Sequence, residues 1–269
     1  MRNTIIKKWM YLCLILIFIL IIAAGQSAKD GALVNGQRIE TENDDQLNTG
    51  DVLREEQYRK DGIEASYPQF TSSPANDKQK LWNQIIKKDF DKILQIYSFN
   101  PFPEPTPVPT GAVPVILKIT YEVKLNNDKF ISIFYKAAYN SPYSAHPSEL
   151  VYTTNIDKKK DKRIKLSDMV NLNSDFAKDF KGWDFITYEK GNELLNTALR
   201  DYRNEISEKD ILLGLRTADQ IGSKNPWGIF SYLTPDRLGI SISVPHYAGD
   251  HVEFEKKYAE LIPFLKPGF

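Results

Sequence analysis

Cysteine is almost absent from this chain of 269 residues: its one cysteine, Cys13, lies inside an apolar run near the N-terminus. The remaining sequence therefore has no thiol for a disulfide bond or for a thiolate metal site. We interpret Cys13 as a small apolar residue of that run. The folded part of the protein must be stabilised by its hydrophobic core alone.

Net charge and nucleotide-binding motifs are lacking as well. The chain has 35 lysines and arginines against 35 aspartates and glutamates, so no net positive field favours a nucleic-acid partner. It has no Gly-x-Ser-x-Gly element, no glycine-rich phosphate loop and no cysteine nucleophile outside the apolar run. We therefore expect no cofactor and no enzymatic activity.

An unbroken apolar run covers residues 9–24, and the residues before it include three basic and no acidic side chains. The run is at the short limit for a membrane span and slightly long for a signal-peptide core. Ala23, Ala24 and Gly25 are small residues of the kind that signal peptidases require. The sequence predicts that residues 1–28 are a signal peptide or a membrane anchor, and both remain open. In either case the rest is exported, so we expect an extracytoplasmic protein that is membrane-anchored or secreted.

The organisation of the exported part follows from its composition and periodicity. Residues 29–60 are polar and predict a flexible stalk. Residues 61–269 predict one α+β domain with a mostly antiparallel sheet and helices packed on one face. Two subdomains, at about 61–160 and 161–269, are an alternative.

Strand and helix patterns are clear over much of this domain. Alternating or nearly continuous apolar residues predict strands over residues 63–67, 115–125, 130–139, 149–157 and 163–166. Apolar residues at helical spacing predict helices at about 81–97 and 191–206, with shorter ones between and after them. A Thr-Pro-Asp-Arg turn at 234–237 predicts a hairpin of residues 228–244.

Three local features suggest departures from regular structure. Pro68 marks its strand as an edge strand or as a strand end. The proline-rich segment 99–114 predicts an extended connector. The lysine-rich turn 158–162 predicts a solvated hairpin tip.

The candidate binding site lies in two proline-framed loops, 139–147 and 245–251. Tyrosine offers a large contact area at a small entropy cost, which suits recognition of proteins or sugars. If the loops lie side by side, they form one binding surface, to which Trp183 and Trp227 are possible additions; otherwise the tyrosines cap the edge of the core. The predicted ligand-binding residues are Tyr139, Tyr143, His146, His246, Tyr247 and Asp250.

The same loops hold the histidines that a metal or acid–base site would need. His146, His246 and His251, with Asp250, occur singly and without the spacing of a metal-binding motif. We therefore expect no metal site and no catalytic residue there. The imidazoles are expected to donate hydrogen bonds to nearby carbonyl groups at strand ends.

Several short motifs, in this order, carry a resemblance to a known family: Ile63–Phe70 (IEASYPQF), Trp82–Ile86 (WNQII), Ser144–Pro147 (SAHP), Ile164–Met169 (IKLSDM), Leu233–Pro235 (LTP) and Val244–Asp250 (VPHYAGD). Over about residues 62–265 the chain resembles a bacterial family of extracytoplasmic domains of unassigned function. Its members include the outer part of RsiV-type anti-sigma factors, which recognise lysozyme, and the N-terminal part of PdaC-type peptidoglycan deacetylases. Only Met1–Lys8 precede the apolar run, and no residues remain for a deacetylase domain, so neither effector activity is expected here.

The resemblance implies a binding domain of the bacterial cell envelope. Its expected ligand is a cell-wall glycan or a wall-acting protein such as a lysozyme-like muramidase, and its expected second partner is the membrane, through residues 9–24 if they are not cleaved. Two alternatives remain: an enzyme that acts on cell-wall glycan or peptide, and a structural partner in a membrane complex.

Overall fold

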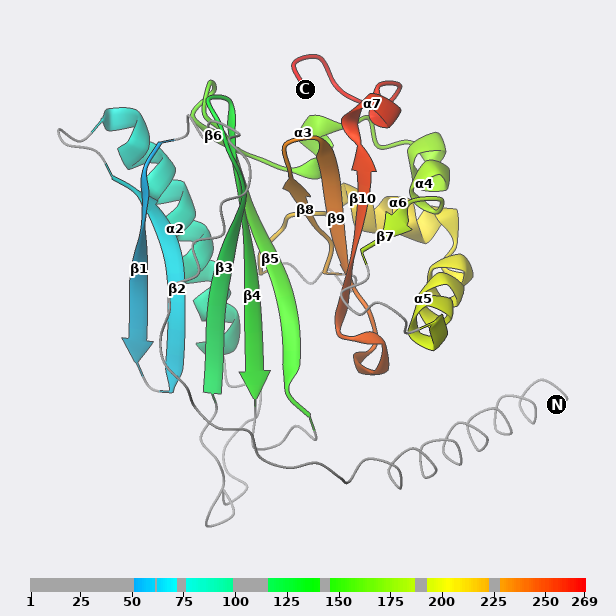
Figure 1. Ribbon diagram of the computed structural model, residues 1–269, viewed down its shortest axis with the longest axis horizontal. Helices are drawn as coiled ribbons and strands as arrows, with labels where there is room; N and C mark the ends of the chain where they lie inside the picture. The colour runs from blue at the N-terminus through cyan, green and yellow to red at the C-terminus, as the bar shows by residue number, and fades with distance from the viewer. Residues whose placement is uncertain are drawn as a thin grey trace, which may run out of the picture. The chain divides into compact units, whose positions relative to one another are not determined.

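The computed structural model describes residues 51–60, 62–71, 76–98, 116–140, 146–186, 193–222 and 228–269. They form an α+β domain with two sheets of mostly antiparallel strands (Figure 1), which confirms the predicted fold class. Within these residues no helix is both long and apolar enough to cross a membrane. The apolar run, residues 29–50 of the predicted stalk and the proline-rich connector lie outside the described residues.

The first sheet has six strands in sequence order: β1 (Leu53–Lys60), β2 (Ile63–Phe70), β3 (Ile116–Asn126), β4 (Phe130–Asn140), β5 (Ser148–Asp157) and β6 (Lys162–Ile164). Neighbouring strands pair antiparallel except β2 and β3, which pair parallel through Ile63–Ala65. Every residue from Phe130 to Tyr135 is buried, because both faces of β4 are covered. The strand that reads as nearly apolar in the sequence is therefore central.

Helix α2 (Asp77–Ser98) covers one face of this sheet (Figure 1). The ring of Phe90 stacks on that of Tyr67 with centroids 4.2 Å apart. The Asn83 side chain accepts a hydrogen bond from the Phe70 N–H at 2.7 Å and donates one to the Phe70 carbonyl at 3.0 Å, which docks the helix onto β2. The helix buries the apolar stripe that its sequence predicts: Trp82, Ile86, Phe90 and Ile93.

The second sheet has the order β7-β10-β9-β8, formed by β7 (Asp184–Phe185), β8 (Phe230–Leu233), β9 (Arg237–Ser243) and β10 (His251–Lys257). The β8–β9 hairpin confirms the predicted one. Gly239 stands opposite Tyr232, whose ring would lie 2.1 Å from a Cβ atom at that position. A glycine is therefore required for the tyrosine ring to cross the hairpin.

Helices α4 (Ser174–Phe180), α5 (Glu193–Glu205) and α6 (Glu208–Arg216) gather beside the second sheet, on the side away from the first (Figure 1). The Phe180 ring packs edge-on against that of Phe254, with centroids 5.3 Å apart. Ser207 caps α6 by accepting a hydrogen bond from the Asp210 N–H at 3.1 Å, as its sequence position predicts. The described residues also form three short helices: α3 (Leu166–Met169), η2 (His246–Ala248) and α7 (Tyr258–Leu261).

The two sheets meet where β8 packs against β4 and β5. The rings of Phe134 and Tyr232 contact edge to face at 5.3 Å. Asn155 donates a side-chain hydrogen bond to the Ser231 carbonyl at 2.8 Å. The strands predicted as one sheet thus form two sheets, which these contacts join. The suggested division into two subdomains stays a prediction.

A buried carboxylate, Asp219, also joins these elements. Its side chain is 1% exposed and accepts hydrogen bonds from the N–H groups of Ser231 and Leu166, both at 2.6 Å, and from the Ser231 hydroxyl at 2.7 Å. The Thr153 hydroxyl of β5 adds a bond at 3.3 Å. Burial raises the pKa of Asp219 in spite of these donors and of the nearby Arg163 charge. One side chain thus links β5, β8 and the start of α3.

Two predictions about the first sheet are wrong. Residues 53–60, assigned to the stalk, form β1, whose charged and mostly exposed side chains suit an edge strand. Pro68 marks neither an edge nor an end, because β1 pairs outside β2 and β2 continues to Phe70. The β3 partner reaches only to Ala65, so no strand on that side requires an N–H group from Pro68.

The predicted solvated hairpin tip is also wrong at its first residue. Lys158 is buried, with its ammonium nitrogen 3.0 Å from the Asp51 carboxylate and 2.7 Å from the Asn126 side-chain oxygen. The same nitrogen lies over the rings of Phe70 and Trp82. A carboxylate from more than a hundred residues upstream thus permits the burial of this charge.

Candidate functional site

The two predicted loops meet through their histidines. The rings of His146 and His246 stack with centroids 5.0 Å apart and planes inclined by 13°. Both residues are exposed. Segments a hundred residues apart in the sequence therefore form one surface, at the end of the domain where β4 ends and β5 begins.

The second of these loops is shaped by its backbone. Pro245 precedes the short helix η2, and Gly249 ends it with a left-handed φ of 98° and an N–H bond to the His246 carbonyl at 3.0 Å. Asp250 follows with φ 68°, a conformation that aspartate tolerates better than most residues. This compact turn holds the His246 ring and the Asp250 carboxylate on the same side.

Asp250 connects the two loops. One carboxylate oxygen lies 2.9 Å from Nδ1 of His246, and the other accepts the backbone N–H of Glu149 at 2.9 Å. The carboxylate therefore fixes the orientation of the exposed imidazole and also holds the start of β5 beside η2.

The side chain of the third histidine of the chain, His251, is buried next to this surface. His251 is 7% exposed, and its ring nitrogens lie 2.6 Å from a Glu253 oxygen and 3.0 Å from a Glu149 oxygen. The Ser241 hydroxyl donates to the same Glu253 oxygen at 3.0 Å. Lys136 reaches the Glu149 carboxylate at 3.4 Å. We call His146, Glu149, His246, Asp250 and His251 the histidine cluster.

The charges in the histidine cluster stabilise one another. Burial lowers the pKa of His251, but the hydrogen bond and charge of Glu253, with the bond to Glu149, outweigh burial and raise it. Burial raises the pKa of Glu149, but the bond to His251 and the Lys136 charge outweigh burial and lower it. A positively charged His251 between carboxylates is therefore favoured.

The structure brings together three of the six predicted ligand-binding residues. His146, His246 and Asp250 belong to the histidine cluster, whereas Tyr139 packs against Tyr97 of α2 at 5.2 Å. Tyr139 and Lys136 point to opposite faces of β4, because side chains alternate along a strand. Tyr139 therefore lies away from the stacked histidines.

Of the other aromatic candidates, the structure describes the side chain of Trp183 alone. Tyr143, Trp227 and the side chain of Tyr247 lie outside the described residues. Trp183 is buried and donates its indole N–H to Asp179 at 2.8 Å, so it belongs to the core. Glu149 and Lys136 were missed, because their partners depend on the β4–β5 register and on β10 rather than on any local motif.

The chemistry open to the histidine cluster is polar recognition. Both ring nitrogens of His251 face carboxylates, so neither nitrogen is free to bind a metal or to take a proton from a ligand. Over the described part of the chain, no group of three or more histidine, cysteine, aspartate or glutamate side chains could hold a metal ion. The exposed imidazoles, the Glu149 carboxylate and the Lys136 ammonium together offer donors, acceptors and a flat ring face.

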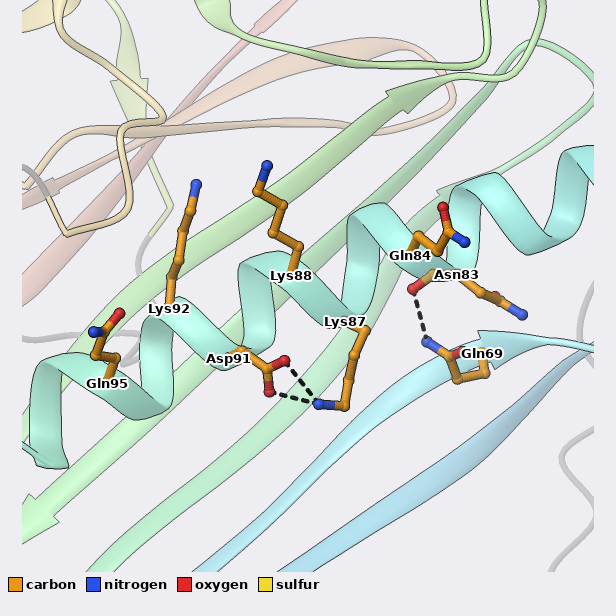
Figure 2. A pocket seen from close by; sticks show the side chains of 8 residues that line it. All are labelled: Gln69, Asn83, Gln84, Lys87, Lys88, Asp91, Lys92 and Gln95. Atoms are coloured by element: carbon orange, nitrogen blue, oxygen red, sulfur yellow. Dashed lines mark hydrogen bonds and ion pairs between the residues drawn. The ribbon is translucent and has the colours of Figure 1, made fainter.

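A second surface lies along α2. A hollow of about 790 Å³ is lined by amide and charged side chains: Gln69, Asn83, Gln84, Lys87, Lys88, Asp91, Lys92 and Gln95. Figure 2 shows that Lys88 and Lys92 extend to one side of the helix, whereas Lys87 turns to Asp91, 2.6 Å away. Seven of these eight residues share one exposed flank of a helix, where lysines are ordinarily solvated. The histidine cluster is the stronger candidate, because it joins separate segments.

No family model matches the chain, and no curated protein matches it. The fold resembles two crystal structures, both of bacterial proteins in a domain family of unknown function. The first, a DUF3298 family protein from Pseudomonas aeruginosa, has 16% sequence identity and a TM-score of 0.43, over 80% of this chain and 93% of that one. The second, a DUF3298 member from Bacteroides fragilis, has 14% identity and a TM-score of 0.45, over 81% and 95%.

Proposed function

We propose that this protein is an extracytoplasmic binding domain of the bacterial cell envelope and that the histidine cluster is its ligand-binding surface. The observation that carries the proposal is the contact between His146 and His246, which unites the two loops. The apolar leader predicted at residues 1–28 and the family resemblance of the sequence support export to the envelope.

The ligand we propose is a cell-wall glycan or a wall-acting protein such as a lysozyme-like muramidase. The side chains of His246 and Glu149 are 54% and 42% exposed, so a ligand can reach a ring face and a carboxylate together. Asp250 holds the imidazole in place before the ligand arrives, which reduces the entropy cost of binding.

Co-sedimentation of the full-length protein with insoluble cell wall, together with pull-down on an immobilised muramidase, tests this proposal. We expect saturable binding to one of the two, weakened at least tenfold by His146→Ala or His246→Ala with the fold retained, because both side chains are exposed. Binding to wall material alone identifies a glycan, and binding to the muramidase alone identifies a protein. No retention on either material contradicts the proposal.

A second function, chemistry on wall glycan or peptide, is favoured by one observation. Asp250 orients His246 through Nδ1, as a carboxylate orients a general base in hydrolases. Release of soluble fragments from wall material by the full-length protein, abolished in His246→Ala, would establish this function. Unchanged release by that variant would exclude His246 as a catalytic residue.

A further inference from the structure

A pocket with a mostly apolar lining lies between the β3–β4 turn and the C-terminal segment. Its volume is about 410 Å³, within the range of small-molecule sites. Its apolar lining comes from the β3–β4 region, with Leu125 and Phe130, and from the C-terminal segment, with Ile262, Leu265 and Phe269. Between Phe130 and Lys136, β4 spans about 20 Å, so this pocket is separate from the histidine cluster.

The walls of the pocket are held in place from several directions. The Phe269 ring stacks on Phe130 with centroids 4.8 Å apart. The C-terminal segment is fixed by the Lys266 N–H bond to the Met169 carbonyl at 2.9 Å. Tyr258 donates its hydroxyl to the Thr234 carbonyl at 3.2 Å, which closes the far side. The pocket is therefore a preformed feature of the fold.

One cation faces this apolar interior. The Lys129 ammonium nitrogen lies 4.8 Å from the Phe130 ring centroid and 5.8 Å from that of Phe269. Across the described residues, no carboxylate lies within 4.0 Å of this nitrogen. An apolar pocket with a single partly buried cation is complementary to a molecule that has an apolar chain and one negative charge.

The rim of the pocket includes an exposed apolar side chain. Ile262 is 68% exposed although it lines the pocket, whereas the neighbouring Leu261 is fully buried. A ligand that covers this apolar side chain together with the adjoining hollow would remove apolar surface from water, which favours binding. Ile262 thus extends the apolar surface from the interior to the solvent.

We propose that this pocket binds a single-chain amphiphile with an anionic head group, such as a fatty acid. The alkyl chain packs against Leu125, Ile262 and Leu265, and the head group pairs with Lys129 over the two phenylalanine rings. This inference goes beyond the proposed function and does not depend on it, because the pocket and the histidine cluster share no residue.

Calorimetric titration of the full-length protein with dodecanoate tests the proposal, with dodecyltrimethylammonium as the cationic ligand of equal chain length. We expect saturable dodecanoate binding, at least about tenfold tighter than binding of the cation. Ile262→Asp should weaken dodecanoate at least tenfold, whereas Leu213→Asp, at a leucine that is 60% exposed on α6, should leave it within about twofold. This pair separates the pocket from any binding by the apolar run.

Lys129→Gln provides the second test, because it keeps a polar side chain that can donate hydrogen bonds and removes the charge. It should abolish the preference for dodecanoate over the cation, whereas Lys162→Gln on β6 should retain that preference. Equal weakening by Ile262→Asp and Leu213→Asp would overturn the proposal, and so would an unchanged preference in Lys129→Gln. Both outcomes are independent of binding to wall material or muramidase.

Discussion

Asp219 and Asp250 use the same device in two different surroundings. Both have a left-handed backbone conformation, with φ of 64° and 68°, and both accept the backbone N–H of a residue far away in the sequence. Asp219 is buried at the junction of the two sheets, whereas the Asp250 side chain is 14% exposed at the surface. Where water is excluded, the carboxylate supports the fold. Where water is near, it positions a loop.

The largest effect is expected at Asp219. Asp219→Ala would leave the N–H groups of Ser231 and Leu166 buried without acceptors, which should lower the free energy of unfolding by about 3–4 kcal/mol. Urea denaturation of the full-length protein measures this. Asp201→Ala, at an exposed position of α5, is the matched control and should change stability by less than about 0.5 kcal/mol. Equal effects of the two variants would refute the assigned role of Asp219.

A smaller effect on stability is expected at Asp250. Asp250→Ala should cost about 1 kcal/mol, because the freed N–H of Glu149 lies near water. The same change should weaken ligand binding at least tenfold, because His246 loses its orienting partner. Asp250→Asn should keep most of the stability, since asparagine also tolerates this backbone conformation. A loss of stability as large as that of Asp219→Ala would remove the contrast between the two sites.

The pH dependence of stability provides a subtler test at His251. Because its pKa is raised, its contribution is fully present below the ordinary histidine pKa of 6.5 and is lost as the pH rises through the folded-state value. The pKa of Glu149 is lowered, so its contribution is present above the ordinary carboxyl range and is lost as the pH falls through its folded-state value. The histidine cluster therefore stabilises the fold most at mildly acidic pH.

The variant His251→Gln makes the pH dependence of the His251 contribution measurable. The stability difference between the natural protein and this variant should be larger at about pH 6 than at about pH 9, as followed by urea denaturation. A difference that is constant or grows with pH would show that His251 is not held in its charged form.

The sequence predicts the features that depend on adjacent residues and misses those that depend on residues far apart in the chain. The β8–β9 hairpin and the α2 stripe are local patterns, in which period and turn chemistry depend on adjacent residues, and both were predicted. Strand β1 was missed because its solvent-facing residues, such as Arg54 and Glu55, have the composition of a loop. The burial of Lys158 was missed because its partner Asp51 is remote in the sequence.

The same distinction between local patterns and long-range contacts applies to the residues of the candidate site. His146, His246 and Asp250 were identified from proline-framed loops at strand ends, and the structure brings them together. Tyr139 was chosen from the same loop, but strand alternation points it to α2. The roles of Glu149 and His251 depend on how β5 lies beside β10, which no local pattern encodes.

The chain has only three histidines, so the imidazole proton resonances of the full-length protein provide the most direct test of the histidine cluster. Titration with soluble cell-wall fragments, and separately with a muramidase, should shift the His146 and His246 signals together along one saturation curve. The His251 signal should move less, since both of its nitrogens are held by carboxylates. Saturable binding that leaves the His146 and His246 signals unchanged would contradict the account.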